Sequence, residues 1–417
     1  MEERNRRMWI PLLLLIAALA AFLVFWLLPN GIGRPNPEQP ENPGQPDPPQ
    51  DPDQPTDPST PTDPDQPTDP TDPSQPTDPD KPTDPDKPTD PEQPEDPIRL
   101  PIVRTDTARY TYGDLQEDLK FLSIQYADHF TYTTYGISAD GRDLYVAYLG
   151  NPQADQQIII TAGMHAREYA NCYVVMQQVE YYLQNYDKLD YRGQSWASLL
   201  EKICFVIVPM CNPDGTMLAQ EGISSLRSVE LRSVVEGIYA REGRRYDSID
   251  TFLAYEWKAN ARGVDLNRNF DAYWSSYEGV SRPSRSNYKG TMANSEVETV
   301  ALVALTESLS HPIASICMHT QGQVIYWRCF QEGAFEAENE ALAGMTKEVT
   351  GYLIIDENQD EPSYSNWTIL AHQIPTLTVE TGISTYPIPY EKYDSMNQRT
   401  LLLWARYAYY YTVENPK

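Results

Sequence analysis

The stretch of sequence that decides the fold is QIIITAGMHARE, residues 157–168. Its first five residues form a short β-branched run typical of a buried strand, and Ala162-Gly163 ends that run. His165 and Glu168 follow three residues apart, a spacing that lets an imidazole and a carboxylate on one tight turn point at the same place. The stretch therefore predicts a buried strand with ligand-binding side chains at its carboxyl end.

The sequence after residue 98 alternates strand and helix patterns. Further strands are predicted at 144–149, 203–209, 313–318, 324–327 and 376–379, and helices at 114–121, 171–183 and 295–310. The motif Asn212-Pro213-Asp214-Gly215 is interpreted as a turn. Strands that alternate with helices favour an α/β fold with a mostly parallel central sheet. Ligand sites in such folds lie beyond the carboxyl ends of the strands.

A third polar residue, His319, directly follows the predicted strand 313–318. With His165 and Glu168 it makes up two imidazoles and one carboxylate, a set that hydrolytic zinc sites use with one position left open for water. We therefore expect one zinc ion on these three residues. The sequence has five histidines, and the other three are expected to be structural or surface residues: His129, His311 and His372.

Glu380 lies at the end of the apolar run 376–379. A carboxylate in that position is rarely left unpaired in a core. A general base that faces a metal-bound water would account for it, and a glutamate in an ion pair at the rim of the sheet is the alternative. We expect Glu380 to be the catalytic base.

The segment WKANARGVDLNRNF, residues 257–270, is too polar for a core strand. It contains Asn267 and Arg268 side by side. An arginine fork binds carboxylates bidentately, and an amide beside it can complete the recognition. The alternative is a solvated loop with a surface arginine. Asp265, two residues earlier, can orient a zinc-bound histidine as a hydrogen-bond acceptor.

Residues 8–28, MWIPLLLLIAALAAFLVFWLL, carry no charge and match the roughly 20 residues that a helix needs to cross a bilayer. Three arginines lie within residues 1–7. The positive-inside rule then predicts a cytoplasmic tail (1–7), a single transmembrane signal anchor (8–28) and export of everything after it. A cleaved signal peptide is the alternative, but it would have a shorter apolar run and a small-residue cleavage site.

Residues 29–97 are a low-complexity segment rich in proline, aspartate and threonine, with a proline at every third position from Pro37 to Pro97. Polyproline II has three residues per turn, so we expect a disordered, extended spacer that reaches at most roughly 190 Å at ~3.1 Å per residue. Between residues 34 and 97, 18 acidic residues outnumber 3 basic ones, which supplies more than half of the net charge of −28. A ligand for a proline-recognising domain is the alternative. Residues 98–417 are the expected folded domain, held outside the membrane.

The composition excludes several classes of protein. No basic stripe lies outside the first seven residues, so a nucleic-acid partner is not expected. The five cysteines are odd in number and none has CxxC spacing, which argues against a disulfide framework and against a cysteine zinc site. Buried free thiols are expected, with one bridge, such as Cys204 to Cys211, left open.

The motifs together resemble one known family. HxxE at 165–168, NPDG at 212–215, VDLNRNF at 264–270, His319 after an apolar strand and Glu380 late in another follow each other in this order. The combination is similar to the zinc metallocarboxypeptidases of the carboxypeptidase A family, over about residues 104 to 415. That resemblance implies a three-layer α/β fold in which helices flank a central mixed, mostly parallel sheet of about eight strands.

The resemblance also assigns roles to residues. It implies zinc on His165, Glu168 and His319, with Glu380 as general base and acid. It implies that Asn267 and Arg268 hold the terminal carboxylate of a peptide substrate, that Asp265 lies behind His165, and that Arg167 contacts the substrate further along. WKANARGVDLNRNF and the long stretch 216–255 look most like bacterial members, some of which are similar to γ-D-glutamyl-diamino acid peptidases that trim cell-wall peptides.

Three positions depart from the family's pattern. Lys258 stands where animal members have an arginine that polarises the scissile carbonyl, so Lys258 or Arg262 is expected in that electrostatic role. The family's mobile tyrosine has no clean counterpart, and Tyr364 is the nearest candidate. By the same spacing Ser365 would lie at the base of the specificity pocket, where it suits neither a strongly aliphatic nor a basic preference.

The expected function is therefore zinc-dependent hydrolysis of C-terminal peptide bonds by a domain on the bacterial cell surface. The first alternative is a γ-D-glutamyl-diamino acid peptidase that acts on peptidoglycan stem peptides with the same residues. The second, from a different class, is a catalytically inactive surface-binding protein on the same fold. The expected partners are a peptide or cell-wall peptide and, through residues 8–28, a membrane. The sequence does not indicate the oligomeric state.

Overall fold

The structure is a computed structural model that describes residues 101–104, 108–383 and 386–417. All of these residues belong to one unit of the chain, Asp90–Lys417. The predicted tail, anchor and spacer lie outside the described residues, so their placement stays a prediction. Among the helices in the described ranges, none combines the length and the apolar character needed to cross a bilayer.

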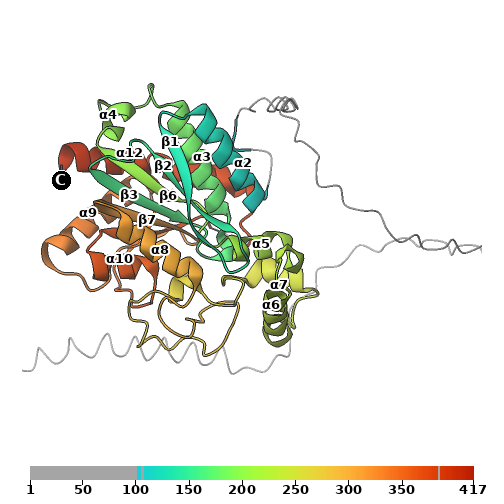
Figure 1. Ribbon diagram of the computed structural model, residues 1–417. Coiled ribbons are helices and arrows are strands. Elements are labelled where there is room, and N and C mark those ends of the chain that lie inside the picture. The colour runs from blue at the N-terminus through green and yellow to red at the C-terminus, as the bar shows by residue number, and fades with distance from the viewer. Residues whose placement is uncertain (1–100, 105–107, 384–385) are drawn as a thin grey trace, which may run out of the picture. The chain divides into compact units, whose positions relative to one another are not determined.

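A sheet of eight strands forms the middle of the described part (Figure 1). Its strands are β1 (Phe130–Ile137), β2 (Asp143–Leu149), β3 (Gln156–Ala162), β6 (Ile203–Val208), β7 (Pro312–Thr320), β8 (Val324–Tyr326), β9 (Leu353–Ile355) and β10 (Thr376–Thr381). They are ordered β1-β2-β6-β3-β7-β10-β8-β9. The neighbours β6, β3, β7 and β10 run parallel, β1, β2 and β6 are antiparallel in succession, and β8 is antiparallel to β10 but parallel to β9. A separate ribbon pairs β4 (Asp190–Tyr191) with β5 (Gln194–Ser195).

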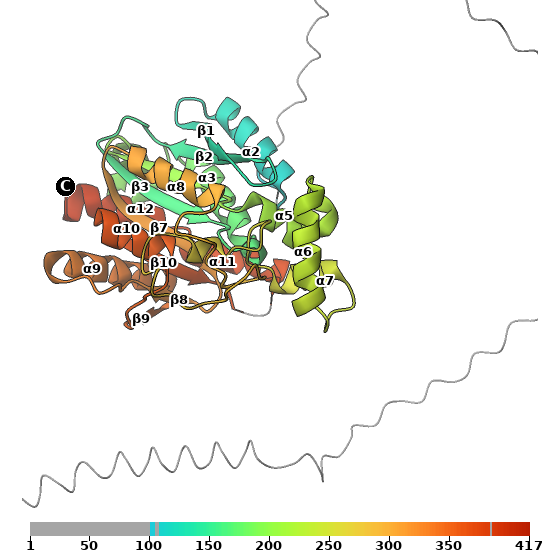
Figure 2. The ribbon, with the colours of Figure 1, turned by 60° about the horizontal axis from the view of Figure 1, so that its bottom comes forward.

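Helices cover both faces of the sheet because its central strands are apolar on both sides. On β6, Phe205 and Ile207 contribute to one core cluster, whereas Val206 and Val208 contribute to the other. The first face packs against α2 (Tyr112–Gln125), α3 (Ala170–Gln184), α4 (Trp196–Leu200), α9 (Gly333–Thr350), α11 (Tyr393–Thr400) and α12 (Leu403–Tyr409). The second packs against α8 (Val297–Ser308) and α10 (Tyr364–His372). Figures 1 and 2 show these layers, which confirm the predicted α/β fold.

Some predicted elements differ from the observed ones. Strand β1 was not predicted, and Asn212-Gly215 is not a free turn. Asn212 caps α5 (Pro213–Glu221) by accepting a hydrogen bond from the Gly215 N–H at 3.0 Å, and Pro213 takes the first helical position, which needs no N–H donor. The chain continues through α6 (Val229–Glu242) and α7 (Ile249–Glu256).

The cysteines match the expectation. All five are buried free thiols, so Cys204 and Cys211 are not bridged. The histidines predicted to be structural also lie away from the site described below. The His129 ring stacks on Tyr186, His311 Nδ1 lies 2.9 Å from a backbone carbonyl, and His372 packs on Trp367.

Candidate active site

Two parallel strands bring the predicted zinc ligands together. His165 and Glu168 belong to the turn after β3 that contains the short helix η1 (Ala166–Glu168), whereas His319 lies within the last residues of the neighbouring strand β7. The turn requires a glycine at position 163, because its φ is +65° and an added Cβ would lie 2.5 Å from Cys172 Sγ. We call the group His165, Glu168 and His319 the metal corner.

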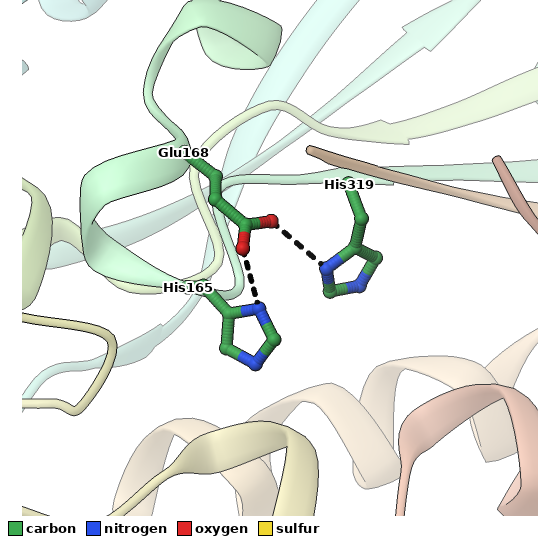
Figure 3. Close-up of side chains that lie close together, drawn as sticks. All are labelled: His165, Glu168 and His319. Carbon is green, nitrogen blue, oxygen red and sulfur yellow. Dashed lines mark hydrogen bonds and ion pairs between the residues drawn. The ribbon is translucent and has the colours of Figure 1, made fainter. Parts of the chain in front are cut away.

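The side chains of the metal corner converge on one point (Figure 3). His165 Nδ1 lies 2.9 Å from Glu168 Oε1, and His319 Nδ1 lies 3.1 Å from Glu168 Oε2. The backbone N–H of Thr320 also donates to Glu168 Oε2 at 3.0 Å. Burial by itself would raise the pKa of the Glu168 carboxyl, but the imidazoles and the Lys258 ammonium hold it well below its usual range. The carboxylate is therefore ionised and points at both imidazoles.

The metal corner fits a zinc ion. One nitrogen of each imidazole and one carboxylate oxygen lie within 4.8 Å of one another, and two histidines with one glutamate are a common ligand set of catalytic zinc. The second nitrogen of His165, Nε2, lies 3.2 Å from Asp265 Oδ1. Asp265 is itself fixed, because its carboxylate accepts the backbone N–H groups of Asn267 at 3.2 Å and Asn287 at 2.9 Å. Such a carboxylate holds a ligating imidazole in the right tautomer and orientation.

Glu380 lies next to the metal corner on β10, directly opposite His319 in the parallel register of β7 and β10. Its Oε2 atom is buried and has no hydrogen-bond partner among the residues that the structure describes. Burial, and after it the negative charge of Glu168, raises the pKa of Glu380 to about 7. A cation on the metal corner would oppose this shift, since it adds positive charge beside the carboxylate. Glu380 is thus a partly buried glutamate with one buried carboxylate oxygen that no described residue hydrogen-bonds, as expected of a proton-transfer group.

A single pocket joins the metal corner to most of the other predicted residues. Its lining consists of His165, Lys258, Asn267, Arg268, His319, Tyr326, Gln359, Glu361, Ser363, Ser365, Thr378 and Glu380. Glu168 is not part of this lining, because it is almost completely buried against His165 and His319. The structure therefore brings the predicted zinc ligands, base and carboxylate-binding pair to one place.

Lys258 and Arg262, the two candidates for the electrostatic role, are placed differently. Lys258 lines the pocket, and its Nζ lies 3.7 Å from Glu168 Oε1. Its backbone is held on both sides, by Ala166 N–H donating to its carbonyl at 3.1 Å and by its own N–H donating to Arg285 O at 2.9 Å. Arg262 is not part of the pocket lining, and its Nη1 lies 3.8 Å from Glu296.

Asn267 and Arg268 belong to η3 (Leu266–Arg268), a short helix that starts at the capping residue Asp265. Arg268 Nη1 donates to its neighbour's backbone carbonyl at 2.8 Å, and its Nε donates to Tyr277 Oη at 3.2 Å. Burial would lower the pKa of Arg268, but the charge of Asp265 raises it, so the guanidinium remains a cation. The segment is a largely buried polar loop that faces the pocket.

Arg167 and Tyr364, two residues suggested by the resemblance, lie outside the pocket lining. Arg167 Nη1 donates to Tyr255 O at 2.7 Å, and its guanidinium stacks 3.8 Å above the ring of Tyr386. Tyr364 is buried, and its hydroxyl lies 2.9 Å from that of Thr306. Tyr364 is therefore not positioned to act as the mobile tyrosine.

The pocket also contains residues that are not among those predicted from the sequence: Tyr326, Gln359, Glu361, Ser363 and Thr378. Thr378 had a usable signal, since it lies two residues before Glu380 and so shares its face of β10. Tyr326 pairs with Thr378 across the antiparallel β8–β10 ladder, which is a long-range contact. Gln359, Glu361 and Ser363 come from the loop before α10, and no local pattern marks them.

The fold and the metal corner place the protein in the class of zinc metallopeptidases with the carboxypeptidase fold. The family model of the zinc carboxypeptidases matches residues 115–387. The chain belongs to the zinc carboxypeptidase family.

Individual relatives agree with this membership. The chain is 27% identical over 295 residues to γ-D-glutamyl-L-diamino acid endopeptidase 1 of Lysinibacillus sphaericus, and the match covers 70% of each chain. It is 25% identical over 214 residues to human mast cell carboxypeptidase A, and this match covers 51% of this chain and 45% of that protein. Among solved structures, thrombin-activatable fibrinolysis inhibitor matches with a TM-score of 0.58 at 18% identity, over 72% of this chain and 73% of that one. This last likeness concerns the fold.

Proposed function

We propose that the protein is a zinc-dependent metallocarboxypeptidase that removes the last residue of peptides at the cell surface. The observation that carries the proposal is the placement of Asn267 and Arg268 in the same pocket as Glu380 and the metal corner. A guanidinium with a neighbouring amide matches a carboxylate. An enzyme that must bind a terminal carboxylate beside its metal cleaves the last peptide bond of its substrate.

The residues of the pocket divide the chemistry among them. Zinc, when bound to the metal corner, lowers the pKa of a water and polarises the scissile carbonyl. Glu380 accepts the proton of the attacking water and passes it to the leaving amine. The Lys258 ammonium provides a fixed positive charge for the developing oxyanion. Asn267 and Arg268 set which bond lies at the metal corner by holding the terminal carboxylate.

A pair of peptides tests the proposal. The zinc-loaded full chain is incubated with a peptide that ends in a free carboxylate and with the same peptide as a C-terminal amide. Release of the last residue from the free acid alone is expected. Cleavage of internal bonds in both peptides, or no cleavage of either, would contradict the proposal.

Glu380→Gln tests the role of the base. The substitution keeps the size of the side chain but removes its ability to take a proton, so kcat should fall by roughly 10³-fold. Zinc content, measured by elemental analysis, should stay the same because Glu380 is not a ligand. A variant with near-normal kcat would show that another group accepts the proton.

A second candidate function is hydrolysis of the bond before a diamino acid in peptidoglycan stem peptides. The likeness to the Lysinibacillus endopeptidase over 70% of each chain favours it. Both functions use the metal corner and Glu380. Release of a diamino acid from a muropeptide, compared with release of ordinary C-terminal residues from a peptide panel, separates them.

We also propose that residues 8–28 anchor the protein in a membrane and that residues 29–97 hold its catalytic domain outside the cell. The support is the uncharged run of 21 residues with arginines before it and the proline period after it. The full chain should stay in membranes washed with alkaline carbonate, and a protease added to intact cells should remove the catalytic domain. A carbonate-soluble chain, or one protected from the protease, would contradict this topology.

A further inference from the structure

Glu361 presents a carboxylate to the pocket that the proposed chemistry does not use. Its backbone carbonyl accepts the Ser363 N–H and the Asn366 side-chain amide, each at 2.8 Å. These bonds fix the loop at the start of α10, and the side chain of Glu361 lines the pocket. The other carboxylate in the lining is Glu380, which lies at the metal corner.

The carboxylate of Glu361 keeps capacity for a further partner. Its Oε1 lies 4.0 Å from Arg268 Nη2, which is longer than a hydrogen bond. Its side chain is 32% exposed, so solvent or a ligand can reach it. Its charge acts within the pocket, since after burial the nearby carboxylates of Glu380, Glu361 and Glu357 raise the pKa of Tyr326.

The lining around Glu361 is polar. The hydroxyls of Ser363 and Ser365 lie 3.1 Å apart, and Thr378 Oγ1 donates to Ser365 Oγ at 3.2 Å. An apolar side chain in this part of the pocket would remove water from Glu361 without replacing its hydrogen bonds, which is unfavourable. An anionic side chain would be repelled. An ammonium group would pair with Glu361 and donate its remaining protons to hydroxyl oxygens.

The Arg268 guanidinium and the Glu361 carboxylate together complement two charged groups of a single substrate residue. If Arg268 holds the α-carboxylate of the terminal residue, Glu361 lies beside that contact and faces the same residue. A terminal residue with an α-carboxylate and a side-chain ammonium carries the complementary charges. Opposite charges at both ends fix the register of the residue as well as its identity.

We propose that Glu361 is a specificity-determining residue that selects a C-terminal residue whose side chain carries an ammonium group. The inference rests on the proposed carboxypeptidase function. It differs from the expectation from spacing that the pocket, with Ser365 at its base, suits neither a strongly aliphatic nor a basic preference, because here the negative charge comes from the loop before α10 and not from position 365.

The test compares peptides that differ only in the last residue, lysine or the uncharged norleucine, with the zinc-loaded full chain. The native chain should have a higher kcat/KM for the lysine peptide. In Glu361→Gln, kcat/KM for lysine should fall by about 10- to 100-fold, the range of one charge-assisted hydrogen bond, while that for norleucine changes by less than about threefold. Asp360→Asn is the matched control, because Asp360 is exposed on the same loop and is not part of the pocket lining.

Each other outcome has a distinct meaning. Equal losses for both peptides in Glu361→Gln would overturn the proposal, because they would show that Glu361 only positions Arg268. A native chain whose kcat/KM for the norleucine peptide equals that for the lysine peptide would overturn the proposal but keep the carboxypeptidase function. A native chain that releases neither residue would overturn the carboxypeptidase function and this inference with it.

Discussion

The metal corner and the loops that line the rest of the pocket are built in different ways. His165, Glu168 and His319 are tied to the ends of two parallel strands, and Glu380 is paired with His319 in the register of the sheet. The loop residues have no strand to hold them, and buried polar side chains take over that task.

Asn260 shows how the loops are held. It is fully buried, its Oδ1 accepts the N–H groups of Arg262 and Val264, and its Nδ2 donates to Glu296 at 2.8 Å. The sheet thus fixes the positions of the metal corner and Glu380, whereas side-chain hydrogen bonds fix the loops that line the rest of the pocket. The two regions should therefore fail separately.

Glu168→Gln should produce the largest effect. The substitution removes the charge that the two imidazoles share, so zinc binding should weaken strongly and activity should fall by roughly 10³-fold or more. Elemental analysis and peptide hydrolysis measure the two losses. His311→Ala is the matched control, since that histidine lies away from the pocket, and it should change neither. Full zinc content in Glu168→Gln would mean that the metal lies elsewhere.

Arg268→Gln should weaken substrate binding by the loops of the pocket without affecting the metal corner. Losing a bidentate cation should lower kcat/KM for free-acid peptides by about 10- to 100-fold, since hydrogen bonds to charged groups contribute roughly 1.5–3 kcal/mol. Zinc content should not change. Restored binding in Arg268→Lys would indicate that a point charge is enough. If Arg268→Gln lost zinc as well, the two regions would not be separate.

Glu298→Gln should produce a smaller, pH-dependent effect on stability. Glu298 lies on α8 and supports the loop that contains Asn260. Its carboxylate accepts the Ala139 N–H at 2.9 Å and contacts the Asn260 amide at 3.3 Å. Burial, and after it the charges of Asp214 and Glu296, raises the pKa of Glu298 to about 7. Since the unfolded chain releases this proton near pH 4.5, the contribution of Glu298 to stability is complete below that pH and is lost as the pH rises to about 7.

The measurement is the free energy of unfolding in denaturant at pH 5 and pH 8. The stability of Glu298→Gln relative to the native chain should increase between these pH values by up to roughly 3 kcal/mol, at about 1.4 kcal/mol per pKa unit. Glu307→Gln, an exposed position on the same helix, should show no such change. Parallel pH profiles for native chain and Glu298→Gln would show that Glu298 is ionised in the fold.

The same division explains how much the sequence could predict. Apolar runs that end in His319 or Glu380 are local signals, and because parallel strands end at one edge of a sheet, they predict a shared site without knowledge of the pairing. Asn267 and Arg268 are predictable as a carboxylate-binding pair because the amide and the guanidinium belong to neighbouring residues in the sequence. Tyr326 and Glu361 enter the pocket through long-range contacts, which spacing does not reveal.

Tyr364 illustrates the limit of carrying a position over by spacing. It begins α10 with its ring packed against Phe270 and Trp367, so the requirements of the core decide its orientation. Strand β1 was missed for a related reason. Most of its residues are polar or half-exposed, and only the pairing with β2 makes it a strand.

The direct pairing of Glu380 with His319 has a consequence for how such enzymes diversify. Because hydrogen bonds between β7 and β10 set the distance between these two residues, insertions or substitutions in the loop before α10 leave that distance unchanged. Related peptidases that descend from one ancestor can thus change their substrate preference through substitutions in a surface loop, while the catalytic residues on the sheet keep their positions.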